Sequence, residues 1–201
     1  MARPTRPNRP APRRGAIATA ATLVLALTGC TGDPDEPDAQ APSSEPTASA
    51  APALPTHTTV GVISGKLPKA DKARVKTKIA AVVDDWFDAA YVGGDWPRSD
   101  FGDAYPHFSK GAAKKAKGDA RLMSNARLGE RLESVEATKR RLRVDVLAVK
   151  RKAVGVTARF VLAMDLAGEV NRSEQVSGSL FLTYRNGGWQ VFGYDVKRGT
   201  A

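Results

Sequence analysis

The chain has 201 residues, a formal net charge of +10 and one cysteine. A single cysteine excludes disulfides within the chain and any metal site built on two or four cysteines. With 42% hydrophobic and 26% charged residues, the whole chain is neither disordered nor an integral membrane protein. The length suits one ordinary domain, and the surplus of basic residues raises nucleic-acid binding as a hypothesis.

The charge is distributed in three zones. Residues 1–29 contain five arginines and no acid, and residues 30–57 contain five acids and no lysine or arginine. Residues 58–201 hold the other 26 basic and 16 acidic residues, a net charge of +10. We therefore treat 1–29 as a candidate signal, 30–57 as a tether and 58–201 as the folded domain.

The first zone has the layout of an export signal. Basic residues ending at Arg13-Arg14 precede an apolar run over residues 16–27, which is too short for a membrane-spanning helix. The run ends in Leu27-Thr28-Gly29-Cys30, which resembles the lipobox of bacterial lipoproteins. The resemblance implies cleavage between Gly29 and Cys30 and a diacylglyceryl group on the Cys30 thiol. An ordinary secretory signal is the alternative, and both the general and the twin-arginine export routes stay open.

A diacylglyceryl group has two acyl chains, which is enough for stable membrane anchoring. The expected location is therefore the outer face of the cytoplasmic membrane, with a lipid anchor and no transmembrane helix. The tether that follows is rich in Pro, Ala, Ser, Thr and acids, so it cannot bury enough apolar surface to fold. As a coil its 27 residues (31–57) span about 30 Å, and as a polyproline-like segment about 80 Å.

Helical periodicity comes first in the folded domain. Apolar residues at Val75, Ile79, Val82, Trp86 and Ala90 predict a helix over 69–91, ended by two glycines. Ser99 and Asp100 then suit the start of a short helix ending at Tyr105. Ser109 is positioned to cap a helix over 110–117, and Asp119 to cap a further turn ending at Met123.

From residue 128 onward the apolar period becomes two. Strands are expected at 142–149, 154–166, 180–184 and 189–196, with a weaker one near 132–137. Asn186-Gly187-Gly188 is a hairpin turn signal, because Asn and Gly tolerate a positive φ. Short turns between consecutive strands require antiparallel pairing. The fold class is therefore α+β, with a long helix and short helices packed on a curved antiparallel sheet of about five strands.

This pattern resembles the NTF2-like (cystatin-like, cone-shaped) superfamily over about residues 70–198. The long first helix with Trp86-Phe87-Asp88-Ala89-Ala90-Tyr91, the short helices after it, and the closing strand pair 180–184 and 188–196 carry the resemblance. Actinobacterial envelope proteins, including lipoproteins and Mce-associated proteins, are similar. The resemblance implies a cone with a pocket between the helices and the sheet.

No hydrolase, zinc-protease or dinucleotide-binding motif is found in the sequence, and we expect no metal and no cofactor. Enzymes of the resembled fold commonly place a His or Asp in the pocket as general base. The corresponding candidates are His107 with Asp88, Asp100 or Asp103. A surface or capping role for His107 is the alternative, because a base needs an oriented partner.

Aromatic and basic residues form separate clusters. One aromatic cluster either lines a ligand pocket or forms the core, and its members are Trp86, Tyr91, Phe101, Tyr105 and Phe108. No aromatic residue lies between 109 and 159, where the bases concentrate, so stacking on single-stranded nucleic acid is not expected. These bases either bind anionic lipid or wall polymers or form a solvated surface. The binding candidates are Lys114, Lys115, Arg140 and Arg141.

The sequence thus predicts a non-enzymatic, membrane-anchored envelope lipoprotein whose domain binds a small apolar ligand or a partner protein. Two alternatives remain: a pocket enzyme using His107 with an Asp, and a structural accessory subunit of an envelope complex.

Overall fold

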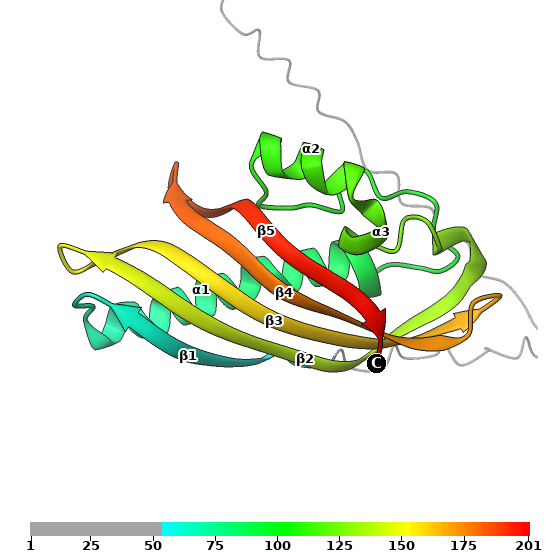
Figure 1. Ribbon diagram of the computed structural model, residues 1–201, viewed down its shortest axis with the longest axis horizontal. Helices are drawn as coiled ribbons and strands as arrows, with labels where there is room; N and C mark the ends of the chain where they lie inside the picture. Colours follow the sequence, from blue (N-terminus) through cyan, green and yellow to red (C-terminus); the bar gives the residue numbers. More distant parts are fainter. Residues whose placement is uncertain (1–53) are drawn as a thin grey trace, which may run out of the picture. The chain divides into compact units, whose positions relative to one another are not determined.

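A computed structural model describes residues 54–201, and the predicted signal, Cys30 and most of the tether lie outside this range. Five strands form one sheet, and α1 (Lys69–Phe87) lies across one of its faces (Figure 1). The strands are β1 (His57–Ser64), β2 (Leu132–Val149), β3 (Lys152–Gly168), β4 (Arg172–Arg185) and β5 (Gly188–Thr200). The smaller helical elements are a π-helical turn (Asp88–Val92), α2 (Lys110–Gly118), α3 (Ala120–Met123) and a 3₁₀ turn (Gly129–Arg131).

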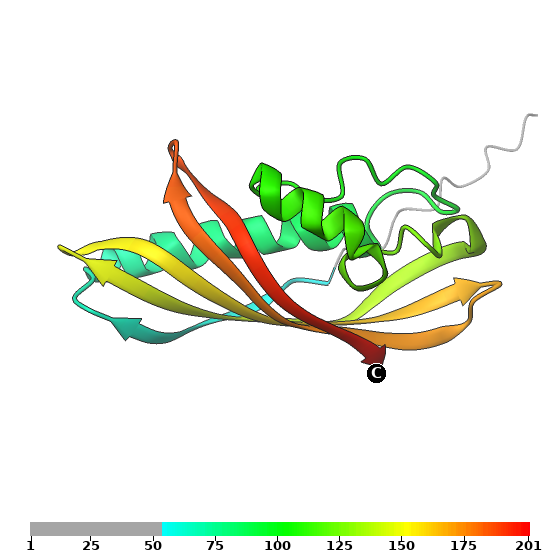
Figure 2. The ribbon, with the colours of Figure 1, turned by 45° about the horizontal axis from the view of Figure 1, so that its top comes forward.

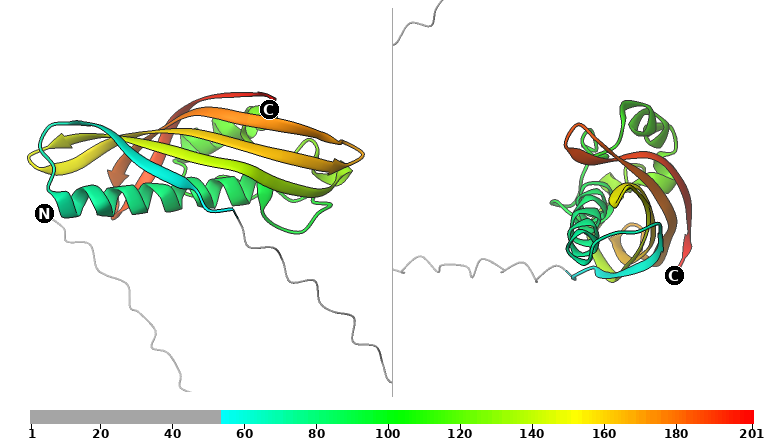
Figure 3. Two further views of the ribbon diagram at one scale, coloured as in Figure 1. Left: turned by 90° about the horizontal axis from the view of Figure 1, so that it is seen from below. Right: turned by 90° about the vertical axis from the view of Figure 1, so that its left-hand side faces the viewer.

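The α+β class and the mostly antiparallel five-stranded sheet agree with the prediction. Strands β2 to β5 pair with their sequence neighbours in antiparallel register. The end view in Figure 3 shows the sheet curled, with α1 on its concave side. Asn186 and Gly187, at the tip between β4 and β5, have φ angles of 51° and 81°, which confirms the predicted turn.

Two details of the predicted sheet were wrong. Segments 132–137 and 142–149 form the single strand β2, and β1, which we did not predict, supplies the fifth strand. In addition, β1 pairs with β2 in parallel, so the sheet is not wholly antiparallel. A parallel pair needs a long crossover, and here the whole helical segment between Ser64 and Leu132 provides it.

The helix α1 begins at the predicted residue and buries the predicted face. Val75, Ile79, Val82 and Trp86 all lie in the core. Regular α-helical geometry ends at Phe87, and the predicted last turn is the π-helical turn to Val92. None of the helices within residues 54–201 is both long and apolar enough to cross a membrane.

The short helices agree only partly with the prediction. Ser109 caps α2, because its hydroxyl oxygen accepts a hydrogen bond from the Ala112 amide at 3.2 Å. Asp119 precedes α3, but its carboxylate accepts a hydrogen bond from the Tyr194 hydroxyl at 2.8 Å instead of capping. The predicted helix from Asp100 to Tyr105 is absent. The Asp100 carboxylate instead accepts a hydrogen bond from the Gly102 amide at 2.7 Å, which forms an Asx turn.

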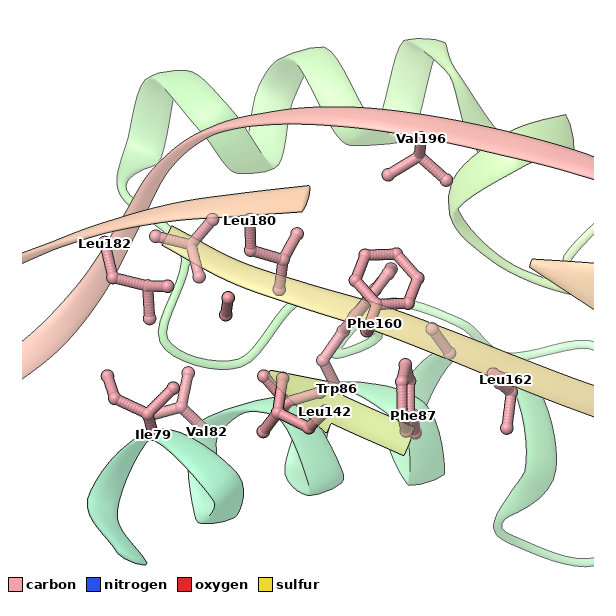
Figure 4. Close-up of a cluster of buried hydrophobic side chains, with 14 of the residues drawn as sticks. Ile79, Val82, Trp86, Phe87, Leu142, Phe160, Leu162, Leu180, Leu182 and Val196 are labelled. Atoms are coloured by element: carbon pink, nitrogen blue, oxygen red, sulfur yellow. The ribbon is translucent and has the colours of Figure 1, made fainter. Parts of the chain in front are cut away.

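The core lies between α1 and the concave face of the sheet. The close-up in Figure 4 shows Ile79, Val82 and Trp86 of α1 facing Phe160, Leu180 and Leu182 from β3 and β4. The Trp86 and Phe160 rings meet edge to face, with centroids 5.1 Å apart, which is a favourable aromatic geometry. Above this core, α2 and α3 lie beside β5 (Figures 1 and 2).

Candidate functional site

A groove of about 810 Å³ runs between α1 and the tips of the two long hairpins. One stripe of α1 forms its first wall, from Asp71 to Asp85, at the three- and four-residue spacing of a helix face. The stripe is about 21 Å long at 1.5 Å per residue. The opposite wall consists of Lys152 and Ala153 of β3, the tip of the β4–β5 hairpin, and His107 from the loop before α2.

The floor of the groove is apolar and partly aromatic. Val75 and Val82 of α1 and Trp189 of β5 are buried beneath it. The Tyr184 ring stands edge-on to Trp189, with centroids 5.5 Å apart, and Tyr184 remains 53% exposed. Its hydroxyl donates to the Gly187 carbonyl at 3.0 Å, so the aromatic wall is held by the hairpin that carries it. An apolar floor with polar groups at its margin is the usual composition of a ligand site.

Two contacts between basic and acidic side chains lie along the groove. Arg74 Nη1 lies 2.9 Å from Asp71 Oδ1, and His107 Nε2 lies 2.7 Å from Asp85 Oδ2. The His107 and Asp85 side chains are 41% and 55% exposed. The groove therefore has a solvent-exposed polar margin and a buried apolar floor.

His107 is held in place by its backbone. Its φ of 61° is unusual for a residue with a side chain. Its carbonyl accepts from the Val191 amide at 2.9 Å, and the Ser109 amide donates to the Val191 carbonyl at 2.8 Å. Because Phe108 is buried between these two bonds, the loop is fixed to β5 and the imidazole faces α1.

The three acidic residues predicted as partners of His107 do not contact it, and Asp85 does. Asp85 contacts the imidazole, whereas Asp88 is ion-paired with Arg140. Asp100 closes its own turn, and Asp103 is an exposed residue of the same loop region. The signal for Asp85 was its spacing of three residues from Val82, which places both on one face of α1.

The aromatic candidates lie in the core and not in the groove. Trp86, Tyr91, Tyr105 and Phe108 are at most 9% exposed, and Phe101 packs against Trp96 with ring centroids 6.2 Å apart. The aromatic residues that do line the groove, Tyr184 and Trp189, were missed. Their signal was their position on either side of the predicted hairpin turn.

The basic candidates separate into three environments. Arg140 is buried, ion-paired with Asp88 and bonded to the Leu54 carbonyl at 3.3 Å, so it cannot contact an anionic surface. Arg141 lies on the outer face of the sheet beside a hollow of about 510 Å³. Lys114 is exposed on α2, and the Lys115 ammonium lies 4.6 Å from the centre of the Tyr194 ring.

Comparisons with protein-family models, with curated proteins and with solved structures each find no match. Within residues 54–201, no group of three or more His, Cys, Asp or Glu side chains is placed to hold a metal ion. The candidate site is therefore defined by the groove and by the chemistry of its own side chains.

Proposed function

We propose that this chain is a membrane-anchored envelope lipoprotein whose domain, of the NTF2-like type, binds a ligand with an apolar body in the groove along α1. The observation that carries the proposal is the groove of about 810 Å³ with its buried floor of Val75, Val82 and Trp189. Its volume lies within the range typical of small-molecule sites. The position of α1 on the concave side of a curled sheet supports the resemblance to the NTF2-like superfamily.

The anchor part of the proposal rests on Leu27-Thr28-Gly29-Cys30. Diacylglycerol on Cys30 would hold the domain at the outer face of the cytoplasmic membrane. Replacing Cys30 with Ser should release the protein from the membrane fraction or block its maturation. Unchanged fractionation of Cys30→Ser would show that the lipobox interpretation is wrong.

The binding part is tested by filling the groove. Ala81 is an exposed residue of α1 that lines the groove, whereas Ala73 is exposed on the same helix outside it. Ala81→Trp should abolish the fluorescence enhancement of Nile red, a neutral apolar dye, and Ala73→Trp should leave it intact. Equal enhancement in both variants would mean that the dye binds elsewhere and would contradict the proposal.

A pocket enzyme is the second candidate, and the His107–Asp85 contact at 2.7 Å favours it. A carboxylate bonded to one imidazole nitrogen leaves the other free as a base. However, both side chains are solvated, and the groove contains no Ser, Thr or Cys as a nucleophile. Binding is therefore the better-supported function. Loss of product formation in both His107→Ala and Asp85→Asn, with ligand affinity unchanged, would reverse that preference.

The accessory-subunit alternative is supported by a patch on the outer face of the sheet. Val62, Leu147 and Phe192 are each more than half exposed there, around a hollow of about 400 Å³. Exposed apolar patches often mark protein interfaces. If this patch mediates association, Leu147→Glu should abolish co-purification of a partner while Nile red binding persists.

A further inference from the structure

We propose that the groove along α1 selects an anionic amphiphile: a molecule with one carboxylate or phosphate head group and a single aliphatic body. This inference rests on the proposed function, because it names the ligand class for the same groove. The head group would lie between Lys78 and Lys152, and the aliphatic body would lie over the floor toward His107.

The charges of the groove carry the inference. Its margin contains two carboxylates: Asp71 pairs with Arg74, and Asp85 contacts the His107 imidazole. Lys78 and Lys152 also line the groove, are exposed, and form no ion pair within residues 54–201. With His107 counted as neutral, three basic side chains (Arg74, Lys78 and Lys152) line the groove with two carboxylates. The net charge is +1, and a ligand with one anionic group balances it.

The two lysines that line the groove come from different elements. Lys78 belongs to α1, and Lys152 begins β3 at the tip of the β2–β3 hairpin. Figures 1 and 3 place this tip beside the start of α1. Side chains on a helix lean toward its N-terminus, and the β2–β3 tip lies at that end of α1. Because both lysines border the same groove, we place the head group between them.

The apolar floor of the groove suits an aliphatic chain. Val75 and Val82 are seven residues apart, which is about 10 Å along α1, and both are buried beneath the groove. Trp189 and Tyr184 continue the apolar surface on the opposite side. Val82 lies between Lys78 and Asp85, which are seven residues, or about 10 Å, apart along α1. A ligand charged at one end therefore matches the groove better than a polymer charged along its whole length.

The experiment compares ligands that differ only in the head group. Decanoate, decyl phosphate and decanol share one aliphatic chain, and their affinities are measured by titration calorimetry. The protein is the chain from residue 30 onward with Cys30→Ser, which contains every described residue. We expect the two anionic ligands to bind at least tenfold more tightly than decanol, and acetate and inorganic phosphate to bind too weakly to detect. The ratio between decanoate and decyl phosphate distinguishes a carboxylate from a phosphate head group.

Each lysine variant has a control outside the groove. Lys78→Gln and Lys152→Gln should each weaken decanoate binding about threefold, and the double variant about tenfold, which is the range for solvated ion pairs. Their controls are Lys76→Gln on α1 and Lys139→Gln on β2, which are exposed outside the groove and should change nothing. Lys78→Arg and Lys152→Arg should retain the preference for the anionic ligands, because they retain the charge.

The possible failures are distinct. If decanol binds as tightly as decanoate and Ala81→Trp blocks both, the groove binds ligands but does not select the head group, and only this inference is wrong. If Ala81→Trp affects none of the three ligands, the proposed function fails along with the inference. Tighter binding of acetate, inorganic phosphate or an acidic peptide than of decanoate would also overturn the anionic amphiphile as the ligand class.

Discussion

Glu174 of β4 is the most deeply buried acidic residue within residues 54–201. Its replacement by Gln tests how much its ion pair contributes to the stability of the fold. Its carboxylate is 6% exposed and lies 2.5 Å from Nε of Arg198, whose side chain is 10% exposed. Arg198 also donates to the Ser124 carbonyl at 2.8 Å and to the Asn125 amide oxygen at 2.6 Å. The pair thus ties β4 and β5 to the segment after α3.

Breaking a buried ion pair from one side costs about 3–5 kcal/mol, because the remaining charge loses its partner. Glu174→Gln retains one oxygen as acceptor, and Arg198 keeps its carbonyl and amide partners, so the expected cost is at the low end, about 3 kcal/mol. For a domain of this size that corresponds to a fall in Tm of about 6–12 °C. Urea unfolding of the Cys30→Ser chain, monitored by circular dichroism, measures it.

The same carboxylate supplies a matched control. Arg172 contacts Glu174 at 2.5 Å, but its side chain is 52% exposed, so Arg172→Met should cost less than about 1 kcal/mol. The double variant Glu174→Met/Arg198→Met should cost less than the sum of the single variants by about 1–3 kcal/mol. If Glu174→Gln costs no more than Arg172→Met, burial of the pair does not govern its energy and the reasoning is refuted.

Three further predictions concern pH and backbone geometry. Burial raises the pKa of Asp84, against the opposing effects of Thr56 and Arg140, so its stabilising contribution is lost as pH rises through the folded-state value. Asp84→Asn should therefore stabilise the protein by a few tenths of a kcal/mol near pH 7 and not near pH 3, and equal effects at both would contradict this. Gly178 has a φ of 153° and a Cβ there would overlap the Asp195 carbonyl, whereas Gly199 has open space. Gly178→Ala should thus cost at least about 2 kcal/mol in urea unfolding and Gly199→Ala under about 1 kcal/mol. Burial also raises the pKa of three of the four tyrosine hydroxyls above the ordinary 10.0, so the free energy of unfolding should fall above about pH 10. The absorbance of these three tyrosinates should appear only as the protein unfolds, and its appearance in the folded protein near pH 10 would contradict the prediction. The three residues are Tyr91, Tyr105 and Tyr194.

Local patterns predicted those elements whose signal lies within a few residues. The apolar spacing of α1, the Ser109 cap and the Asn186-Gly187 turn each depend on chain neighbours, and each is present. The strand β1 was missed because its sequence shows no clean alternation. It contains a register irregularity between Val60 and Ile63, where the Asp145 carboxylate accepts the Val62 amide at 2.8 Å. That contact joins residues 83 positions apart, which no local pattern can reveal.

The groove was harder to predict than the fold. It forms where α1 meets the tips of two hairpins, and the hairpin turns determine which residues reach it. Lys150 and Arg151 adopt positive φ angles of 48° and 63°, a geometry that their residue types do not signal. This turn sets where Lys152 and Ala153 enter β3. The sequence showed a basic cluster there, but only the register of β2 and β3 shows that one of its members faces α1.

The acids at the end of α1 show why an Asp partner for His107 was predicted but the wrong Asp was named. Asp84, Asp85 and Asp88 lie at or just beyond the last turn of this helix, which carries no basic residue, so the helix dipole disfavours all three charges. Each takes a partner from a different part of the chain: Thr56 before β1, His107 in the loop before α2, and Arg140 on β2. A cluster of carboxylates at this end of a helix therefore signals attachment of distant segments. Successive residues on a helix are rotated by about 100° from one another, so the choice among the three acids for His107 depends on the packing of α1 against the sheet.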